Sequence, residues 1–197
     1  MARKTERNAW SRVTGKGIYP VEYASLLLNP LRRLICPPSL LIRRMRLNST
    51  DHVLEIGCGP GYFSPSIATF LTGGKLTLLD YQKGMLDIAE TRLKERSLSN
   101  YARHQGDAKT LSFADNAFDS AFMVTVLGEV GDAEAALREA VRVLKPAGRL
   151  SITEIFGDPD FVSREELKRW TRNVGLIFER SFGPPFYYTC NFRKPLN

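Results

Sequence analysis

Cysteine and histidine are scarce in this sequence, and their scarcity excludes several kinds of site. The 197 residues include three cysteines, Cys36, Cys58 and Cys190, and two histidines, His52 and His104. No CxxC spacing occurs, so a zinc site built from Cys and His cannot be assembled, and we expect no metal. The odd, scattered cysteines give no disulfide framework, which predicts a reducing, cytoplasmic environment.

Long apolar runs are also lacking. No segment approaches the roughly 18 consecutive apolar residues that a membrane-spanning helix needs. The first residues are polar and basic, without the apolar core of a signal peptide. The chain length suits one α/β domain, and a hydrophobic fraction of 43% is enough to build a core.

The positive charge is confined to one part of the chain. Residues 1–48 hold ten Lys or Arg and two acidic residues, so they account for the net charge of +7, and the remainder is nearly neutral. Prolines at 30, 37 and 38 divide this part into short helices in which leucines alternate with arginines. We therefore expect a basic helical lid over residues 1–48 and a second region, residues 49–197, that forms the main domain.

From residue 51 onward, short apolar runs alternate with helical segments, which is typical of a parallel sheet covered on both faces. Strands are predicted near residues 52–56, 75–80, 102–105, 120–124 and 149–153. Helices are predicted near residues 62–71, 84–96 and 133–144, and another should begin at Ser163 with a capping box. Two closing strands, near residues 176–182 and 187–192, could form an antiparallel hairpin.

One turn carries most of the functional information. After the first strand the chain reads Glu55-Ile56-Gly57-Cys58-Gly59-Pro60-Gly61 and then opens a helix. Glycines are needed where backbone turns tightly and approaches a ligand. Asp80 ends the second strand, where a carboxylate can accept hydrogen bonds from ribose hydroxyls. Asp107 follows the third strand and could accept a hydrogen bond from an adenine amino group.

This ordered set resembles the class I S-adenosylmethionine-dependent methyltransferases, particularly the branch of quinone-biosynthesis and small-molecule methylases. The resemblance runs from about residue 51 to 155 and implies a Rossmann-like, seven-stranded sheet that is mostly parallel, with its last strand antiparallel. It also implies S-adenosylmethionine as cofactor and S-adenosylhomocysteine as product. The cofactor-binding positions that it implies are Glu55, Gly57, Cys58, Gly59, Pro60, Gly61, Asp80, Tyr81, Met85, Asp107, Ala108 and Thr125.

Plainer roles remain open for several of these residues. Glu55 could be a strand-end charge that reaches solvent, Asp80 a helix cap, and Asp107 a turn residue. Tyr81 and Met85 could simply belong to the core, since their spacing is also that of a buried helix face.

The catalytic residue is less clear from the sequence than the cofactor site. A sulfonium methyl is already activated, so orientation of the acceptor is the main requirement. Glu129, after the fourth strand, is one candidate for a general base, at a position where family members often carry histidine; a helix-start carboxylate is the alternative. Tyr19 is a second candidate, if the N-terminal segment folds over the site.

The expected acceptor is a small, lipophilic or anionic molecule, and the basic segment could contact an anionic membrane. Alternatively, its leucines pack onto the helices of the sheet. Nucleic acid is disfavoured, because no Asn/Asp-Pro-Pro-aromatic motif follows the fourth strand, although a small RNA is not excluded. A nicotinamide dehydrogenase is disfavoured, because the third glycine falls one residue early. A non-catalytic sensor of S-adenosylmethionine is the remaining alternative.

Overall fold

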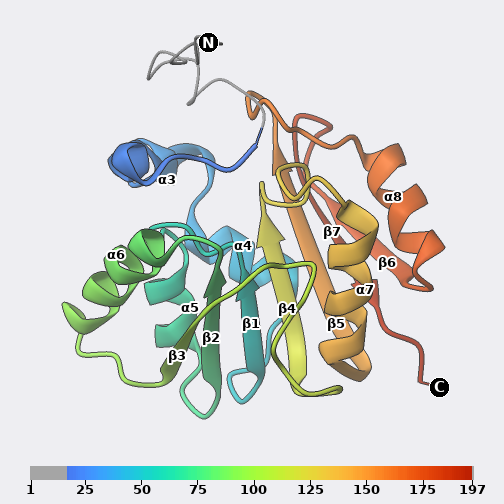
Figure 1. Cartoon of the computed structure of the whole chain (residues 1–197), viewed down its shortest axis with the longest axis horizontal. Helices are drawn as coiled ribbons and strands as arrows, with labels where there is room; N and C mark the ends of the chain where they lie inside the picture. The colour runs from blue at the N-terminus through green and yellow to red at the C-terminus, as the bar shows by residue number, and fades with distance from the viewer. Residues whose placement is uncertain (1–16, 197) are drawn as a thin grey trace, which may run out of the picture.

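The described residues form one twisted sheet of seven strands (Figure 1). The structure is a computed structural model, and its described part covers residues 17–196. Along the sheet the order is β3-β2-β1-β4-β5-β7-β6. The strands are β1 (His52–Ile56), β2 (Lys75–Asp80), β3 (Tyr101–Gln105), β4 (Phe118–Val124), β5 (Leu144–Ile155), β6 (Ile177–Phe182) and β7 (Tyr187–Arg193).

Only β7 runs against its neighbours. Strands β1 to β5 pair in parallel, whereas β7 pairs antiparallel with both β5 and β6. The expected fold, including the antiparallel last strand and the closing hairpin, is therefore confirmed. The order reverses between β1 and β4, and the carboxyl ends of these two strands lie where open α/β sheets bind ligands.

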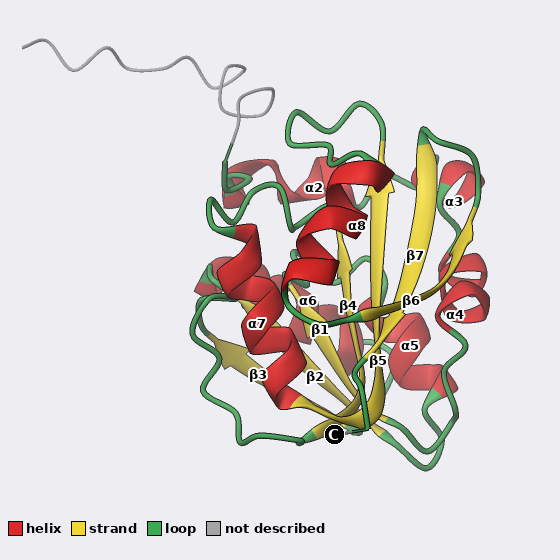
Figure 2. Ribbon diagram, turned by 90° about the vertical axis from the view of Figure 1, so that its right-hand side faces the viewer, coloured by secondary structure: helices red, strands yellow, loops and turns green. Residues whose placement is uncertain are grey.

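Helices cover both faces of the sheet (Figures 1 and 2). On one face lie α4 (Pro38–Met45), α5 (Ser64–Phe70) and α6 (Lys83–Lys94), and on the other lie α7 (Ala133–Val143) and α8 (Arg164–Asn173). Ser163 caps α8 as expected, because its hydroxyl accepts a hydrogen bond from the Glu166 amide at 3.2 Å. No helix among residues 17–196 has the length and apolar character needed to cross a bilayer.

The described part of the N-terminal segment consists of short elements that end in α4. They are η1 (Val21–Tyr23), α2 (Ala24–Leu27) and α3 (Arg32–Ile35), and Figure 1 shows α3 at the upper left, above α6. Helix α4 buries Leu41 and Met45 in the core. Arg44, expected among the exposed basic residues, is only 9% exposed, and its guanidinium lies 4.5 Å from the centre of the Tyr187 ring. Arg44 therefore serves packing rather than the basic surface.

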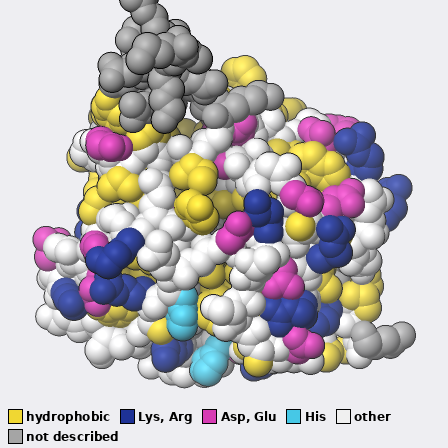
Figure 3. Space-filling model, viewed as in Figure 1, with side chains coloured by type: hydrophobic (Ala, Val, Ile, Leu, Met, Phe, Trp, Pro, Cys, Tyr) yellow, Lys and Arg dark blue, Asp and Glu magenta, His cyan; other side chains and the backbone are white. Residues whose placement is uncertain are grey.

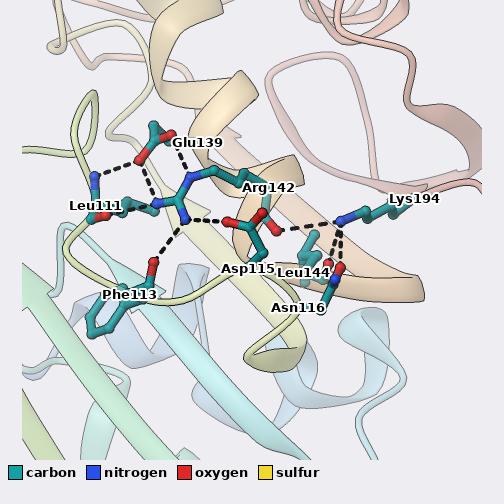
Figure 4. A network of polar contacts seen from close by, with 8 residues as sticks. All are labelled: Leu111, Phe113, Asp115, Asn116, Glu139, Arg142, Leu144 and Lys194. Atoms are coloured by element: carbon teal, nitrogen blue, oxygen red, sulfur yellow. Dashed lines mark hydrogen bonds and ion pairs between the residues drawn. The ribbon is translucent and has the colours of Figure 1, made fainter.

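A polar network anchors the loop between β3 and β4, which contains the expected adenine-contacting positions (Figure 4). The Arg142 guanidinium on α7 donates to the carbonyl oxygens of Leu111 and Phe113, each at 2.8 Å. It also pairs with Asp115 at 2.7 Å and with Glu139 at 2.8 Å. One side chain thus joins two backbone carbonyls and two carboxylates, which holds the loop against α7.

Candidate functional site

A cavity of about 650 Å³ lies at the carboxyl ends of the five strands β1 to β5, with residues 17–36 forming part of its wall. Its volume is within the range of small-molecule sites. Of the twelve expected cofactor positions, all except Gly61 line this cavity, as do Tyr19 and Glu129. The fold therefore brings together residues that come from four strand ends and from the N-terminal segment.

The three glycines of the turn after β1 have different surroundings. All three have positive φ, at +70° for Gly57, +53° for Gly59 and +74° for Gly61. A Cβ added at Gly57 would lie 2.5 Å from a Val126 methyl, and one added at Gly61 would lie 2.8 Å from the Ala89 Cβ. A Cβ at Gly59 would have no closer neighbour than Leu27 Cδ1, at 4.0 Å. Gly59 thus leaves room inside the cavity, whereas Gly61 allows the turn to pack on α6.

Glu55 ends in the interior rather than in solvent. Its side chain is 3% exposed, and Oε2 accepts a hydrogen bond from the Ser64 hydroxyl at 2.6 Å. Burial raises the pKa of this carboxyl to about 8, partly offset by the Ser64 hydrogen bond. The alternative of a solvent-facing charge is wrong, and Glu55 is a buried acceptor on the cavity wall.

Asp80 connects the second strand to the glycine turn. Its Oδ2 accepts a hydrogen bond from the Gly59 amide at 2.8 Å, and Oδ1 accepts one from the Gln82 amide at 2.9 Å. The side chain is buried, and burial raises its pKa against the opposing effect of these backbone donors. The residue at the N-cap of α6 is Gln82, so Asp80 is not the helix cap itself.

The expected adenine side of the cavity is less tightly defined. Met85 is buried and lines the cavity, whereas Tyr81 also lines it but is 58% exposed. Asp107 accepts a hydrogen bond from the Lys109 amide at 2.9 Å, so the turn role is present, yet its half-buried side chain and Ala108 also line the cavity.

Thr125 and Glu129 follow β4 at the opposite side of the cavity. Thr125 has φ of +51°, a strained value for a β-branched residue, and strained backbone of this kind is enriched at functional sites. Glu129 lies in a turn four residues before α7 begins, so it is not a helix-start carboxylate. Burial raises its pKa to about 8, with smaller contributions from Asp158 and Asp160.

Tyr19 lines the cavity, and hydrogen bonds of its backbone and its side chain fix its position. Its carbonyl accepts a hydrogen bond from the Gln82 side chain at 2.7 Å, and its hydroxyl turns back to the Tyr23 carbonyl at 3.4 Å. The Val21 side chain packs against α6 where Gly84 leaves space, since a Cβ there would lie 2.9 Å from a Val21 methyl. The segment around Tyr19 is thus held across the cavity.

Sequence reasoning missed several lining residues. Asp158 and Asp160 lie on the loop after β5, and Arg32 on α3 stacks 4.8 Å from the Tyr62 ring centre. Their position next to a strand end was the signal that could have identified the two aspartates. Neither histidine lines the cavity: His52 is in β1 and His104 in β3, and the histidine surface in Figure 3 lies on the lower half of the molecule.

A glycine turn and a buried strand-end aspartate on one cavity form the pattern by which Rossmann-like folds bind nucleosides. Comparison with known proteins narrows this class. Residues 54–152 match the family model described as a methyltransferase domain. The chain is 32% identical over 114 residues to a demethylmenaquinone methyltransferase of Geobacillus sp. (strain WCH70), which covers 57% of this chain and 49% of that protein.

Further similarities agree with this match. An O-methyltransferase of Pyrenophora dematioidea is 30% identical over 134 residues, which covers 66% of this chain and 49% of the relative. The crystal structure of a SAM-dependent methyltransferase from Aquifex aeolicus superposes with a TM-score of 0.84 at 21% identity, over 90% of this chain and 100% of the other. That likeness supports the fold alone, and the chain spans about half the length of the curated relatives that it matches.

The chain belongs to the methyltransferase domain family, because the family model matches half of its length. The expected methyltransferase family is confirmed at this level. The cavity fits the expected cofactor, S-adenosylmethionine, on two observations. Space is left at Gly59 where a side chain would intrude, and two buried carboxyl groups, Glu55 and Asp80, line the same cavity.

Proposed function

We propose that this protein transfers a methyl group from S-adenosylmethionine to a small acceptor bound in the same cavity. The observation that carries the proposal is the continuity of the cavity. It begins at Glu55, Gly59 and Asp80 and continues past Thr125 to Glu129 and the loop after β5. An enzyme needs space beside the cofactor for the acceptor, whereas a protein that only senses the cofactor does not need this space.

The residues of the cavity have two proposed roles, which are to bind the cofactor and to orient the acceptor. Asp80 is positioned to hold ribose hydroxyls, and Glu55 is positioned to accept from an ammonium group. Gly57, Cys58, Gly59 and Pro60 supply backbone that can approach the ligand closely, while Gly61 acts through the packing of α6. When bound, S-adenosylmethionine supplies an activated methyl group on a sulfonium. The remaining task of the chain is to align the acceptor and exclude water.

Calorimetry with S-adenosylhomocysteine tests the cofactor half of the proposal. Asp80→Ala removes the acceptor for the Gly59 amide and the expected ribose ligand, so affinity should fall at least about tenfold. Asp87→Ala is a matched control, because Asp87 is a partly exposed residue of α6 that pairs with Lys83 and is absent from the lining. Transfer of labelled methyl from S-adenosylmethionine into cell-extract components tests turnover. Binding without any transfer would favour the sensor.

We further propose that the cavity mouth contacts an anionic membrane surface, from which a lipophilic acceptor could enter. Leu31, Leu34 and Ile35 are 66%, 82% and 64% exposed around α3, and Arg33 beside them is also exposed. Figure 3 shows apolar surface at the upper left, where α3 lies in Figure 1. Ile35 also lines the cavity, so this apolar surface is continuous with the site. Apolar side chains beside arginines favour binding to anionic lipid.

Vesicle flotation tests the membrane contact. Deleting residues 1–48 would remove Leu41 and Met45 from the core, so point variants are the sharper test. The double variant Leu34→Ser, Ile35→Ser should lose recruitment to vesicles containing phosphatidylglycerol. Ile177→Ser, at an exposed apolar position on β6, should retain it. Absence of recruitment of the unaltered protein would refute the membrane contact without affecting the methyltransferase proposal.

The three cysteines are free and buried. We propose a cytoplasmic location, which is where cysteines without disulfide partners are usual.

A further inference from the structure

Carboxyl groups gather at the end of the cavity beyond the cofactor positions. Glu129 follows β4, and Asp158 and Asp160 follow β5, and all three line the cavity. The two loops are in contact, since a Cβ added at Gly128 would overlap the Asp160 carbonyl oxygen. Asp160 accepts a hydrogen bond from the Gly17 amide at 2.8 Å, and Asp158 accepts one from the Asp160 amide at 2.9 Å. We call Glu129, Asp158 and Asp160 the acidic end of the cavity.

A fourth carboxyl beside the acidic end lacks a donor. Glu154, at the end of β5, is 1% exposed. Its Oε2 has only a long contact, 3.5 Å, with the Val162 amide, and its Oε1 has no hydrogen-bond partner among the described residues. Burial raises its pKa to about 8, and the three members of the acidic end raise it further, whereas no described cation lowers it. Glu154 is therefore a neutral carboxyl at pH 7, and its surroundings among the described residues are poor in positive charge.

The basic residues that line the cavity offset the charge of the acidic end only in part. Among the described lining residues only Arg32 and Lys109 are basic. Arg32 donates to the Leu27 carbonyl and stacks on Tyr62, and Lys109 pairs with Asp107 at 3.5 Å. Burial raises the pKa of Asp158 and Arg32 lowers it, but Arg32 is one cation beside three carboxyl groups. An anionic acceptor would therefore meet an excess of carboxyl groups at this end. The sequence expectation of an anionic acceptor conflicts with this interior.

We propose that the acidic end binds the cationic nitrogen of the acceptor, and that the acceptor is an amine. This inference rests on the proposed methyltransferase function. Aromatic and aliphatic side chains of Ile18, Tyr19 and Phe156 line the same end and would contact an apolar body attached to the amine.

Glu129 is the group at this end that is placed to take a proton. An ammonium has no lone pair to donate until a proton leaves. A bound cation favours the ionised form of the half-buried Glu129 carboxyl, and the carboxylate can then receive that proton. The nitrogen lone pair then forms the bond to the methyl carbon while the bond from that carbon to sulfur breaks. The electron pair of the broken bond stays on sulfur, so charge and electrons balance.

Three probes of similar shape test the proposal by binding alone. They are 2-phenylethylamine, 2-phenylethanol and phenylacetate, each titrated into the full chain with and without saturating S-adenosylhomocysteine. The amine should bind and raise the melting temperature, and the alcohol and the carboxylate should not. Glu129→Gln and Asp158→Asn should each weaken amine binding roughly tenfold. Their affinity for S-adenosylhomocysteine should change by less than about twofold. Glu165→Gln, an exposed acid outside the lining, is the matched control.

Two outcomes would overturn the proposal. Binding of the alcohol or the carboxylate as tightly as the amine would show that the acidic end does not select a cation. Weaker binding of S-adenosylmethionine, but not of S-adenosylhomocysteine, in the two variants, together with no amine binding, would assign the carboxylates to the sulfonium instead. Failure of the protein to bind S-adenosylhomocysteine is a separate result that contradicts the proposed function, and the titrations without that ligand still decide whether the amine binds.

Discussion

Gly59 and Gly61 lie two residues apart in one turn, and replacing each by alanine should have separable consequences. Both residues have positive φ. A methyl at Gly61 would meet the Ala89 Cβ at 2.8 Å and the Ala89 Cα, part of the α6 backbone, at 2.9 Å. A methyl at Gly59 would meet only Leu27 Cδ1, at 4.0 Å, and would project into the cavity. Gly61→Ala should therefore damage the fold, and Gly59→Ala should damage the ligand site.

The expected loss of stability in the two alanine variants has two contributions. Left-handed backbone costs an L-residue about 1–2 kcal/mol, which applies to both variants. Overpacking adds about 1–3 kcal/mol at Gly61 alone, because backbone atoms of α6 cannot move aside easily. Each kcal/mol lowers the melting temperature of a protein of this size by about 2–4 °C. We expect a fall of roughly 4–20 °C for Gly61→Ala and of roughly 2–8 °C for Gly59→Ala.

Thermal and urea unfolding measure the first effect, and calorimetry with S-adenosylhomocysteine measures the second. Gly59→Ala should bind at least about tenfold more weakly than the unaltered protein. Gly61→Ala should retain most of its affinity well below its melting temperature. Unchanged binding by Gly59→Ala would show that the ligand does not approach this turn. Unchanged stability of Gly61→Ala would refute the packing argument for the third glycine.

Three further predictions concern charged groups. At pH 7 the binding of S-adenosylhomocysteine should release close to one proton from Glu55, whose pKa burial raises to about 8, because a ligand ammonium favours the carboxylate. Calorimetry in buffers of different ionisation enthalpy measures this release, which Glu55→Gln should abolish. Arg142→Met should lower the free energy of unfolding by about 2–3 kcal/mol, since four residues lose their shared donor; an unchanged urea midpoint would contradict this. Burial raises the pKa of Glu154 to about 8, so its stabilising contribution is complete below the unfolded pKa, about 4.3, and is lost as the pH rises through 8. The Glu154→Gln variant stays neutral at both pH values. Its free energy of unfolding, minus that of the unaltered protein, should be higher at pH 8.5 than at pH 4.5 by on the order of 2–3 kcal/mol. Parallel profiles of the free energy of unfolding against pH for the two proteins would contradict this mechanism.

The strands of the sheet could be predicted from the sequence because each is marked by a pattern within its own segment. Strands β1 and β2 begin and end at the expected residues, since each is a short apolar run bounded by polar or turn residues. The glycine turn and Asp80 follow directly from their position at the strand ends. The start of β5 was predicted late: it begins at Leu144, because the chain continues from α7 straight into pairing with Phe118.

Long-range contacts could not be read from spacing. Arg44 lies among exposed arginines in the sequence, yet it stacks on Tyr187 and donates to Thr189 at 3.5 Å, 145 positions away. Glu129 and Asp160 meet only because β4 and β5 are neighbours in the sheet and end at the same edge. Sequence reasoning could place each residue at a strand end, but the acidic end of the cavity depends on the strand order.

The net charge of the chain and the charge inside its cavity have opposite signs, and different ligands respond to each. Exposed groups such as Arg33, Arg43 and Arg46 act through water, so they attract an extended anionic surface and are screened by salt. Buried carboxyl groups act over short distances in a less polar interior, where the nearest charges dominate. A net charge of +7 therefore does not imply an anionic acceptor. An amphiphilic amine would satisfy both environments, because its apolar body suits the apolar surface around α3 at the cavity mouth and its nitrogen suits the acidic end.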